Sequence, residues 1–172
     1  MNSELSLNYF SPTNTTKNVL EAIAEGMDIP TARTIDMTRP ENRKNLDEGL
    51  PDGPVLIGAP VYAGRIAKDA VAAFKTLTGG GRPAVLTVLY GNREFEDALL
   101  ELKDITIECG FKPFAAGAFI GEHSFSTQAH PIAVKRPDTQ DLDKAKAFGK
   151  QAADLLKNSG GNGEAVDVPG NF

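Results

Sequence analysis

Six residues near the N-terminus carry a dense set of polar groups that could bind a ligand. They are Ser11, Pro12, Thr13, Asn14, Thr15 and Thr16, which supply four hydroxyls and one amide in six positions. A helix N-terminus offers unpaired backbone N–H groups and partial positive charge, so it can hold a phosphate without lysine or arginine. The alternative, an ordinary helix N-cap, needs only one such side chain. The number of hydroxyls therefore favours a phosphate site.

Several other kinds of site lack the residues that they require. No Gly-x-Gly-x-x-Gly or Gly-x-x-x-x-Gly-Lys sequence follows the first apolar run, which argues against a dinucleotide or nucleoside triphosphate. The single cysteine, Cys109, cannot supply the thiolates of an iron–sulfur cluster or a structural zinc site. His123 and His130 have no carboxylates at metal-ligand spacing. We therefore expect no metal.

Apolar runs of strand length alternate with amphipathic stretches, a pattern typical of a parallel sheet covered by helices on both faces. The second run is the most polar, which indicates an edge strand. The predicted strands are Leu5 to Tyr9, Ala32 to Asp36, Val55 to Ala59, Ala84 to Tyr90 and Phe114 to Ile120. Helical spacing predicts helices over Val19 to Met27, Ala70 to Phe74, Phe95 to Leu102 and Asp138 to Gly160. The alternation admits the strand order 2-1-3-4-5 and other doubly wound orders.

The loops after the third and fourth predicted strands complete the candidate site, because open parallel sheets bind ligands at the carboxyl ends of their strands. The third strand leads into Pro60, Val61, Tyr62, Ala63 and Gly64, and the fourth into Tyr90, Gly91, Asn92, Arg93 and Phe95. Tyr62 either stacks on a ligand or packs over its own loop. Arg93 either faces the ligand or pairs with a neighbouring glutamate on the surface.

Composition indicates one globular domain. Hydrophobic residues make up 41% and charged residues 24% of the 172 residues, and the net charge is −5. The lack of a basic cluster argues against nucleic acid as a partner. Residues 1 to 10 have no basic start followed by a long apolar run, so we expect no membrane anchor and a cytoplasmic location. We predict loops over Thr38 to Pro54 and Gly121 to Pro137, a domain over 1–158, and a flexible tail or start of a linker over 159–172.

The pattern Ser11-x-Thr13-x-x-Thr16 after the first strand resembles the phosphate-binding loop of flavodoxins. The resemblance implies the flavodoxin-like three-layer sandwich, with a five-stranded parallel sheet in the order 2-1-3-4-5, and FMN as the cofactor. It implies that Tyr62 stacks on the flavin and that a backbone carbonyl between residues 62 and 64 turns toward flavin N5. It also implies that residues 90–93 wrap the flavin pyrimidine.

A narrower resemblance covers nearly the whole chain. The sequences Pro-Val-Tyr-x-Gly-Arg at 60–65, Tyr-Gly-Asn-Arg at 90–93 and Gly-Glu-His-Ser at 121–124 resemble the flavodoxin half of ferredoxin–flavodoxin fusion proteins. This resemblance implies a redox protein as partner, with a ferredoxin-type domain as the candidate. The expected function is electron transfer through FMN, with no catalytic acid or base on the protein. The alternatives are an NAD(P)H- or quinone-dependent FMN reductase, with residues 121–137 making room for the second substrate, and a flavin-free docking module.

Overall fold

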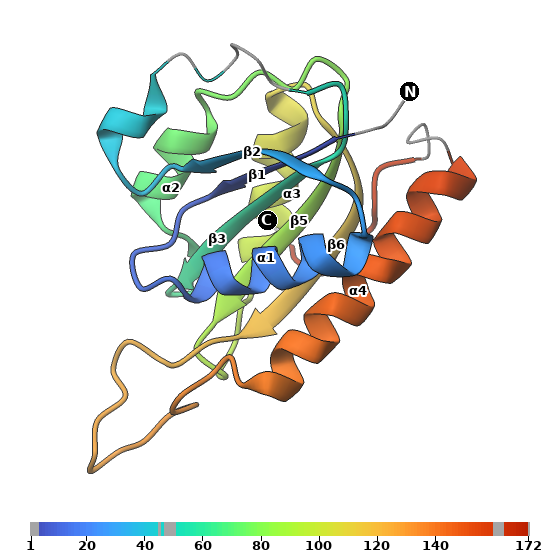
Figure 1. Ribbon diagram of the computed structural model, residues 1–172. Helices are drawn as coiled ribbons and strands as arrows, with labels where there is room; N and C mark the ends of the chain where they lie inside the picture. Colours follow the sequence, from blue (N-terminus) through green and yellow to red (C-terminus); the bar gives the residue numbers. More distant parts are fainter. Residues whose placement is uncertain (1–3, 45, 47–50, 160–163, 172) are drawn as a thin grey trace.

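The computed structural model describes residues 4–44, 46, 51–159 and 164–171, and it contains one parallel sheet between two layers of helices (Figure 1). The strands are β1 (Leu5–Tyr9), β2 (Thr31–Asp36), β3 (Val55–Tyr62), β4 (Arg65–Ile66), β5 (Pro83–Tyr90) and β6 (Lys112–Ile120). The helices are α1 (Thr15–Met27), η1 (Pro40–Arg43), α2 (Lys68–Phe74), α3 (Ala98–Glu108) and α4 (Thr139–Ser159).

The strand order is β2-β1-β3-β5-β6, and all of these pairings are parallel. The short strand β4 lies off this path and pairs antiparallel with the end of β3. Without β4, the order is the predicted 2-1-3-4-5. The fold prediction is therefore confirmed, and β4 is an addition that the sequence pattern did not predict.

Two hydrophobic clusters hold the layers together, one on each face of the sheet. One includes Ile57 and Leu86 of the sheet with side chains of α2 and α3. The other includes Leu56 and Val85 with side chains of α1 and α4. Neighbouring residues of β3 and β5 thus face opposite clusters, as expected for central strands buried on both sides.

Helices α1 and α4 approach each other closely enough for their backbones to touch. A Cβ atom at Gly26 would lie 2.0 Å from the carbonyl oxygen of Lys146, and one at Gly149 would lie 2.1 Å from that of Ile23. A methyl group at either position would push the helices apart. The two glycines therefore set the spacing of this helix pair.

Several predicted bounds differ from the structure or lie outside the described residues. The expected loop from Thr38 contains the 3₁₀ helix η1, and part of the rest of that loop lies outside the described residues. Helix α3 begins at Ala98, after Asp97 at its N-cap, rather than at Phe95. The predicted end of the last helix, Gly160, also lies outside the described residues, and the described helix runs to Ser159. Within the described residues, no helix is long and apolar enough to cross a bilayer.

Residues 164–171, which we call the C-terminal strap, run along β6 and α3. The N–H of Val166 donates to the carbonyl of Pro113 at 2.9 Å, and Val168 packs against the hydrophobic cluster under α2 and α3. The N–H of Asn171 donates to the Asp97 carboxylate at 2.9 Å. The glycine-rich composition that predicts a flexible tail gives no indication of these contacts. The start of a linker in this region stays a prediction.

Candidate functional site

The loop between β1 and α1 is a tight turn that ends at a left-handed residue. Asn14 is the N-cap of α1, with φ 63°, and its side chain makes no capping hydrogen bond. The capping hydrogen bond comes instead from the side chain of Ser11, whose Oγ accepts the N–H of Lys17 at 3.1 Å. The N–H of Ser11 donates to Thr38 Oγ1 at 2.8 Å, which ties the turn to the segment after β2. The helix N-cap, the alternative to a phosphate site in the sequence prediction, therefore does not exclude such a site, because a single side chain does the capping.

The first turn of α1 leaves polar groups for a ligand. The first bond within the helix runs from the N–H of Asn18 to the carbonyl of Asn14 at 3.0 Å, so the N–H groups of Thr15 and Thr16 precede the helical ladder. Thr16 is fully buried, and its Oγ1 has no hydrogen-bond partner in the described structure. Thr13 Oγ1 lies 3.2 Å from Thr15 Oγ1. A buried hydroxyl without a partner is costly. Ser6, Asn8 and Thr87 also have such buried atoms, and of these residues Thr16 is the one in the first turn of a helix.

The end of β3 forms a tight hairpin with β4. Its turn residues Ala63 and Gly64 have φ values of 50° and 73°, a conformation typical of two-residue hairpin turns. Glu101 of α3 fixes the hairpin, because its carboxylate accepts the N–H of Ile66 at 2.8 Å and pairs with Arg65 at 2.9 Å. Tyr62 is 48% exposed at the start of this turn. Its ring is therefore available to a planar ligand.

The loop from Gly91 to Asp97 follows β5 and lies against this hairpin. The rings of Tyr90 and Phe95 meet edge to face, with centroids 5.4 Å apart, and Phe95 also packs on the core. A Cβ atom at Gly64 would lie 2.1 Å from the carboxylate of Glu96, so the two loops touch. Arg93 is exposed. Phe95 thus anchors this loop to the hydrophobic core.

The segment 121–137 follows β6 and lies beside residue 15 at the start of α1 and residue 91 of the loop after β5. A Cβ atom at Gly121 would lie 3.7 Å from the Cβ of Thr15, and one at Gly91 would lie 2.3 Å from the His123 ring. The segment folds back on itself through a bond from the N–H of Glu122 to the carbonyl of Arg136 at 2.9 Å. The sequence prediction of a loop is correct, but the placement of the His123 ring on Gly91 is a contact that the composition does not indicate.

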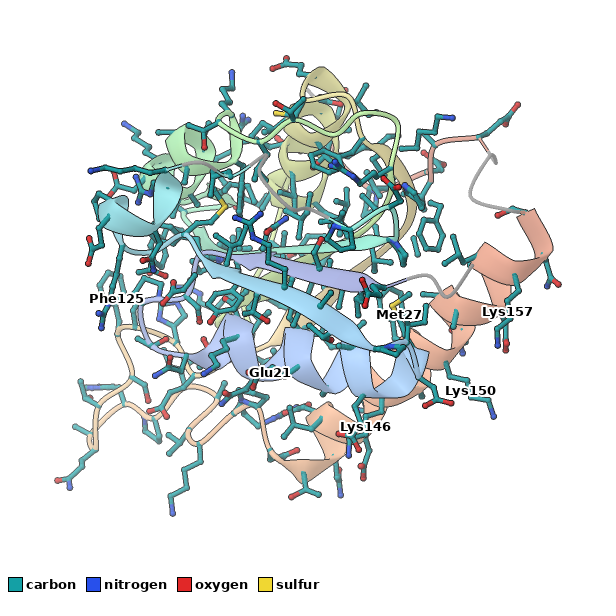
Figure 2. The ribbon with its side chains drawn as sticks, turned by 45° about the horizontal axis from the view of Figure 1, so that its top comes forward. Glu21, Met27, Phe125, Lys146, Lys150 and Lys157 are labelled. Atoms are coloured by element: carbon teal, nitrogen blue, oxygen red, sulfur yellow. The ribbon has the colours of Figure 1, made fainter. Side chains whose placement is uncertain are left out.

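An ion pair anchors this segment to α4. Arg136 donates to the buried carboxylate of Asp141 through two nitrogen atoms, and the N–H of Asp138 donates to the same carboxylate at 2.9 Å. The hydrogen bonds from Arg136 lower the pKa of Asp141 below its usual value, although burial acts in the opposite direction. Phe125, in contrast, is 78% exposed and lies at the side of the molecule where α1 begins (Figure 2).

The four loops therefore adjoin one another at the carboxyl edge of the sheet. Contacts link residue 15 to 121, residue 91 to 123, and residue 64 to 96. Among the described residues, no group of three or more His, Cys, Asp or Glu side chains could hold a metal ion. The groups available for binding are hydroxyls, backbone N–H groups and aromatic rings, which suit a phosphate joined to a planar ring.

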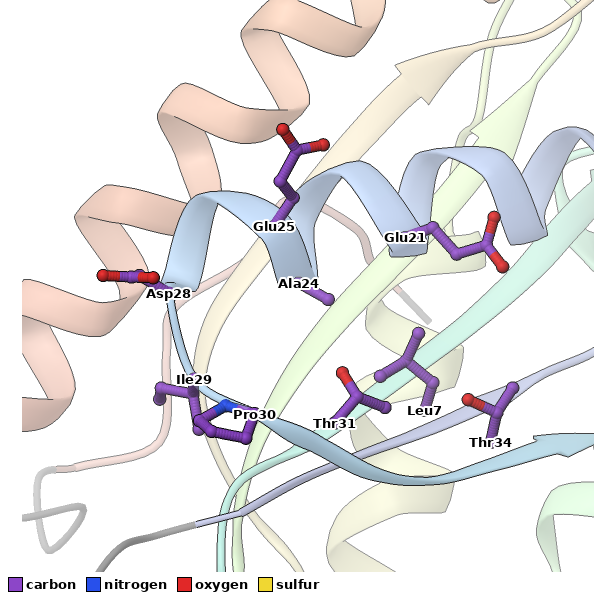
Figure 3. A pocket seen from close by; sticks show the side chains of 9 residues that line it. All are labelled: Leu7, Glu21, Ala24, Glu25, Asp28, Ile29, Pro30, Thr31 and Thr34. Atoms are coloured by element: carbon purple, nitrogen blue, oxygen red, sulfur yellow. The ribbon is translucent and has the colours of Figure 1, made fainter.

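Two surface hollows lie away from these loops. One of about 590 Å³ lies between the C-terminal half of α1 and the start of β2, and Figure 3 shows three carboxylates, Glu21, Glu25 and Asp28, on its α1 side. Another of about 330 Å³ lies against β2 and includes Asp36 and Asn42. Neither hollow contains a residue of the predicted site. Lys146 of α4 pairs with Glu25 at 2.8 Å, so part of the negative charge beside the first hollow is neutralised.

Solved structures resemble this chain in fold. Flavodoxin 1 from Bacillus cereus has a TM-score of 0.60 and 17% sequence identity, over 90% of this chain and 98% of that one. An NADH:FMN oxidoreductase has a TM-score of 0.58 and 15% identity, over 87% of this chain and 89% of that one. The flavodiiron core of Flv1 from Synechocystis has a TM-score of 0.63 and 17% identity, over 92% of this chain and only 37% of that one.

No protein-family model and no curated protein matches the sequence. The similarity to solved structures therefore shows the fold alone. Three observations indicate the same fold. They are the strand order, the two helical layers, and the match to a flavodoxin over 90% of this chain. The chain has the flavodoxin-like α/β sandwich fold.

Proposed function

We propose that this protein binds FMN at the four adjoining loops and carries electrons through it. The observation that carries the proposal is the buried Thr16 hydroxyl, which has no partner and lies in the first turn of α1. That turn offers backbone N–H groups for a phosphate. The fold resemblance to flavodoxins supports the same ligand.

Each loop has a separate task in this proposal. Residues 11–16 hold the phosphate through hydroxyl and backbone donors, and the Tyr62 ring covers one face of the flavin. Residues 90–93 surround the pyrimidine with backbone N–H groups, and Arg93 supplies positive charge beside it. A backbone carbonyl between residues 62 and 64 would accept a hydrogen bond from the N–H of the reduced flavin, because the turn there contains Gly64 at φ 73° and can rotate. FMN itself supplies the electron transfer.

A titration tests this proposal directly. The protein as purified, or after incubation with FMN, should show flavin absorbance and should quench flavin fluorescence at one equivalent. Riboflavin, which lacks the phosphate, should bind more weakly. A colourless protein that binds neither compound would refute the proposal and favour the flavin-free docking module.

A reductase is the second candidate, and the fold resemblance to an NADH:FMN oxidoreductase is the observation that favours it. In that case a second substrate would lie above the flavin, beside residues 121–137. Mixing the loaded protein with NADH, NADPH or a quinol separates the two functions. Rapid bleaching of the flavin by any of them supports the reductase. Reduction only by light and a sacrificial donor supports the carrier.

The partner is also a proposal. We expect a redox protein to exchange electrons with the bound flavin, and the sequence resemblance to fusion proteins makes a ferredoxin-type domain the first to test. Stopped-flow mixing of the reduced loaded protein with an oxidised ferredoxin would measure the transfer rate. Absence of flavin reoxidation at every ferredoxin concentration would exclude that partner class.

A further inference from the structure

The C-terminal strap, residues 164–171, reaches the edge of the candidate site. It leaves β6 after the bond between Val166 and Pro113, and it packs Val168 into the cluster under α3. A Cβ atom at Gly170 would lie 2.8 Å from the Cβ of Leu100, so the strap touches α3. The strap ends with the bond from the N–H of Asn171 to Asp97. It thus connects the far edge of the sheet to the start of α3.

Asp97 is the residue at which the loop after β5 becomes α3. Its carbonyl accepts the N–H of Glu101 at 2.8 Å, as the first bond of the helix. An N-cap aspartate ordinarily turns its carboxylate back onto its own helix. The Asp97 carboxylate makes no such bond, and it accepts the strap instead. The strap therefore takes the place of the helix as the partner that fixes this side chain.

The loop that ends at Asp97 has a backbone that needs support. Glu96 has a φ value of 42°, in the left-handed region that a glutamate seldom adopts, and Asn92 has a φ value of 57°, which asparagine tolerates better. Such conformations persist where the surroundings fix them. The described supports include the contact of Glu96 with Gly64, the ring contact of Phe95 with Tyr90, the contact of His123 with Gly91, and the strap at Asp97.

We propose that the strap is a positioning segment for the loop 91–97 and so for the planar part of the bound ligand. This inference rests on the proposed function for the identity of the ligand. The described contacts of the strap are with β6, α3 and Asp97, so we expect it to act on the ring side of the site and to leave the phosphate site unchanged.

Three variants test the strap, and a fourth is the control. A chain that ends at Ser159 removes it, Val168→Asp places a charge in its apolar contact, and Gly170→Ala forces it away from α3. Ala165→Asp adds the same charge at an exposed strap position and should behave as the wild type. The first measurement is hydrogen exchange of the ligand-free proteins. We expect faster exchange at residues 91–100 in the three variants and unchanged exchange at residues 11–20.

The second measurement compares the affinities for FMN and riboflavin. Loss of the strap should weaken both by the same factor, about tenfold, because the loop must then be ordered at each binding event. A variant of the phosphate site should weaken FMN alone. Unchanged exchange at 91–100, or exchange that rises evenly over the whole chain, would overturn the inference even if FMN binds. Failure of the wild type to bind any flavin would refute the proposed function and leave the exchange result valid.

Discussion

Replacing Thr16 by valine exchanges a buried hydroxyl for a methyl group of nearly the same shape, and the structure predicts opposite effects on stability and on binding. In the ligand-free protein the Thr16 hydroxyl is fully buried without a partner. Such a group costs about 1–3 kcal/mol, so the free energy of unfolding should rise, by ~1 kcal/mol. With FMN bound, the same change removes one hydrogen bond to a charged oxygen. The affinity should fall by about 1.5–3 kcal/mol, or roughly 10- to 150-fold.

The assay is urea unfolding of the ligand-free protein together with titrations of FMN and riboflavin. Riboflavin binding should not change, because that ligand has no phosphate. Thr106→Val is the matched control, since Thr106 is also buried but donates to the carbonyl of Leu102 at 2.6 Å, far along α3. The control should lose stability and keep its FMN affinity. A Thr16→Val protein that binds FMN as tightly as the wild type, or that loses riboflavin equally, would refute the phosphate assignment.

Three further predictions concern stability and reactivity. Arg136 lowers the pKa of Asp141 in the folded protein. The ion pair therefore stabilises the fold above the pKa of an unfolded aspartate, and this stabilisation is lost as the pH falls through the lowered pKa. Asp141→Asn should accordingly flatten the acid side of a plot of Tm against pH. Gly149→Ala should destabilise the protein by ~2 kcal/mol in urea unfolding, since its methyl group would meet the carbonyl of Ile23. Burial raises the pKa of the Cys109 thiol, so iodoacetamide at pH 8 should modify it more slowly than a free thiol, and equal rates would contradict this.

Local patterns in the sequence predict the elements that bury apolar surface on two sides. The central strands β3 and β5 contain continuous apolar runs, Val55-Leu56-Ile57 and Ala84-Val85-Leu86, and both lie where they were expected. The edge position of β2 followed from its polarity. Strand β4 was not predicted, because a strand of two residues, Arg65 and Ile66, is too short to show an alternating pattern.

Contacts between distant residues could not be predicted in the same way. Phe95 continues the apolar spacing of α3, yet it lies before the helix and packs on Tyr90. Val168 lies in a glycine-rich stretch whose composition predicts a flexible tail. It packs against the core only because β6 and α3 lie beside it, and local sequence does not show this. In the candidate site, the types of residues 11–16 suggested an anion, but only the structure shows Ser11 as the cap and Thr16 as the hydroxyl without a partner.

The close backbone contact of α1 with α4 has a mechanical consequence. At Gly26 and Gly149 the two helices meet with no side chain between their backbones, so their separation there is fixed by hard contact. Helix α1 begins at Thr15 and Thr16, and α4 carries Asp141, to which Arg136 of the segment 121–137 donates. The same helix contact thus helps to set the distance between two walls of the candidate site.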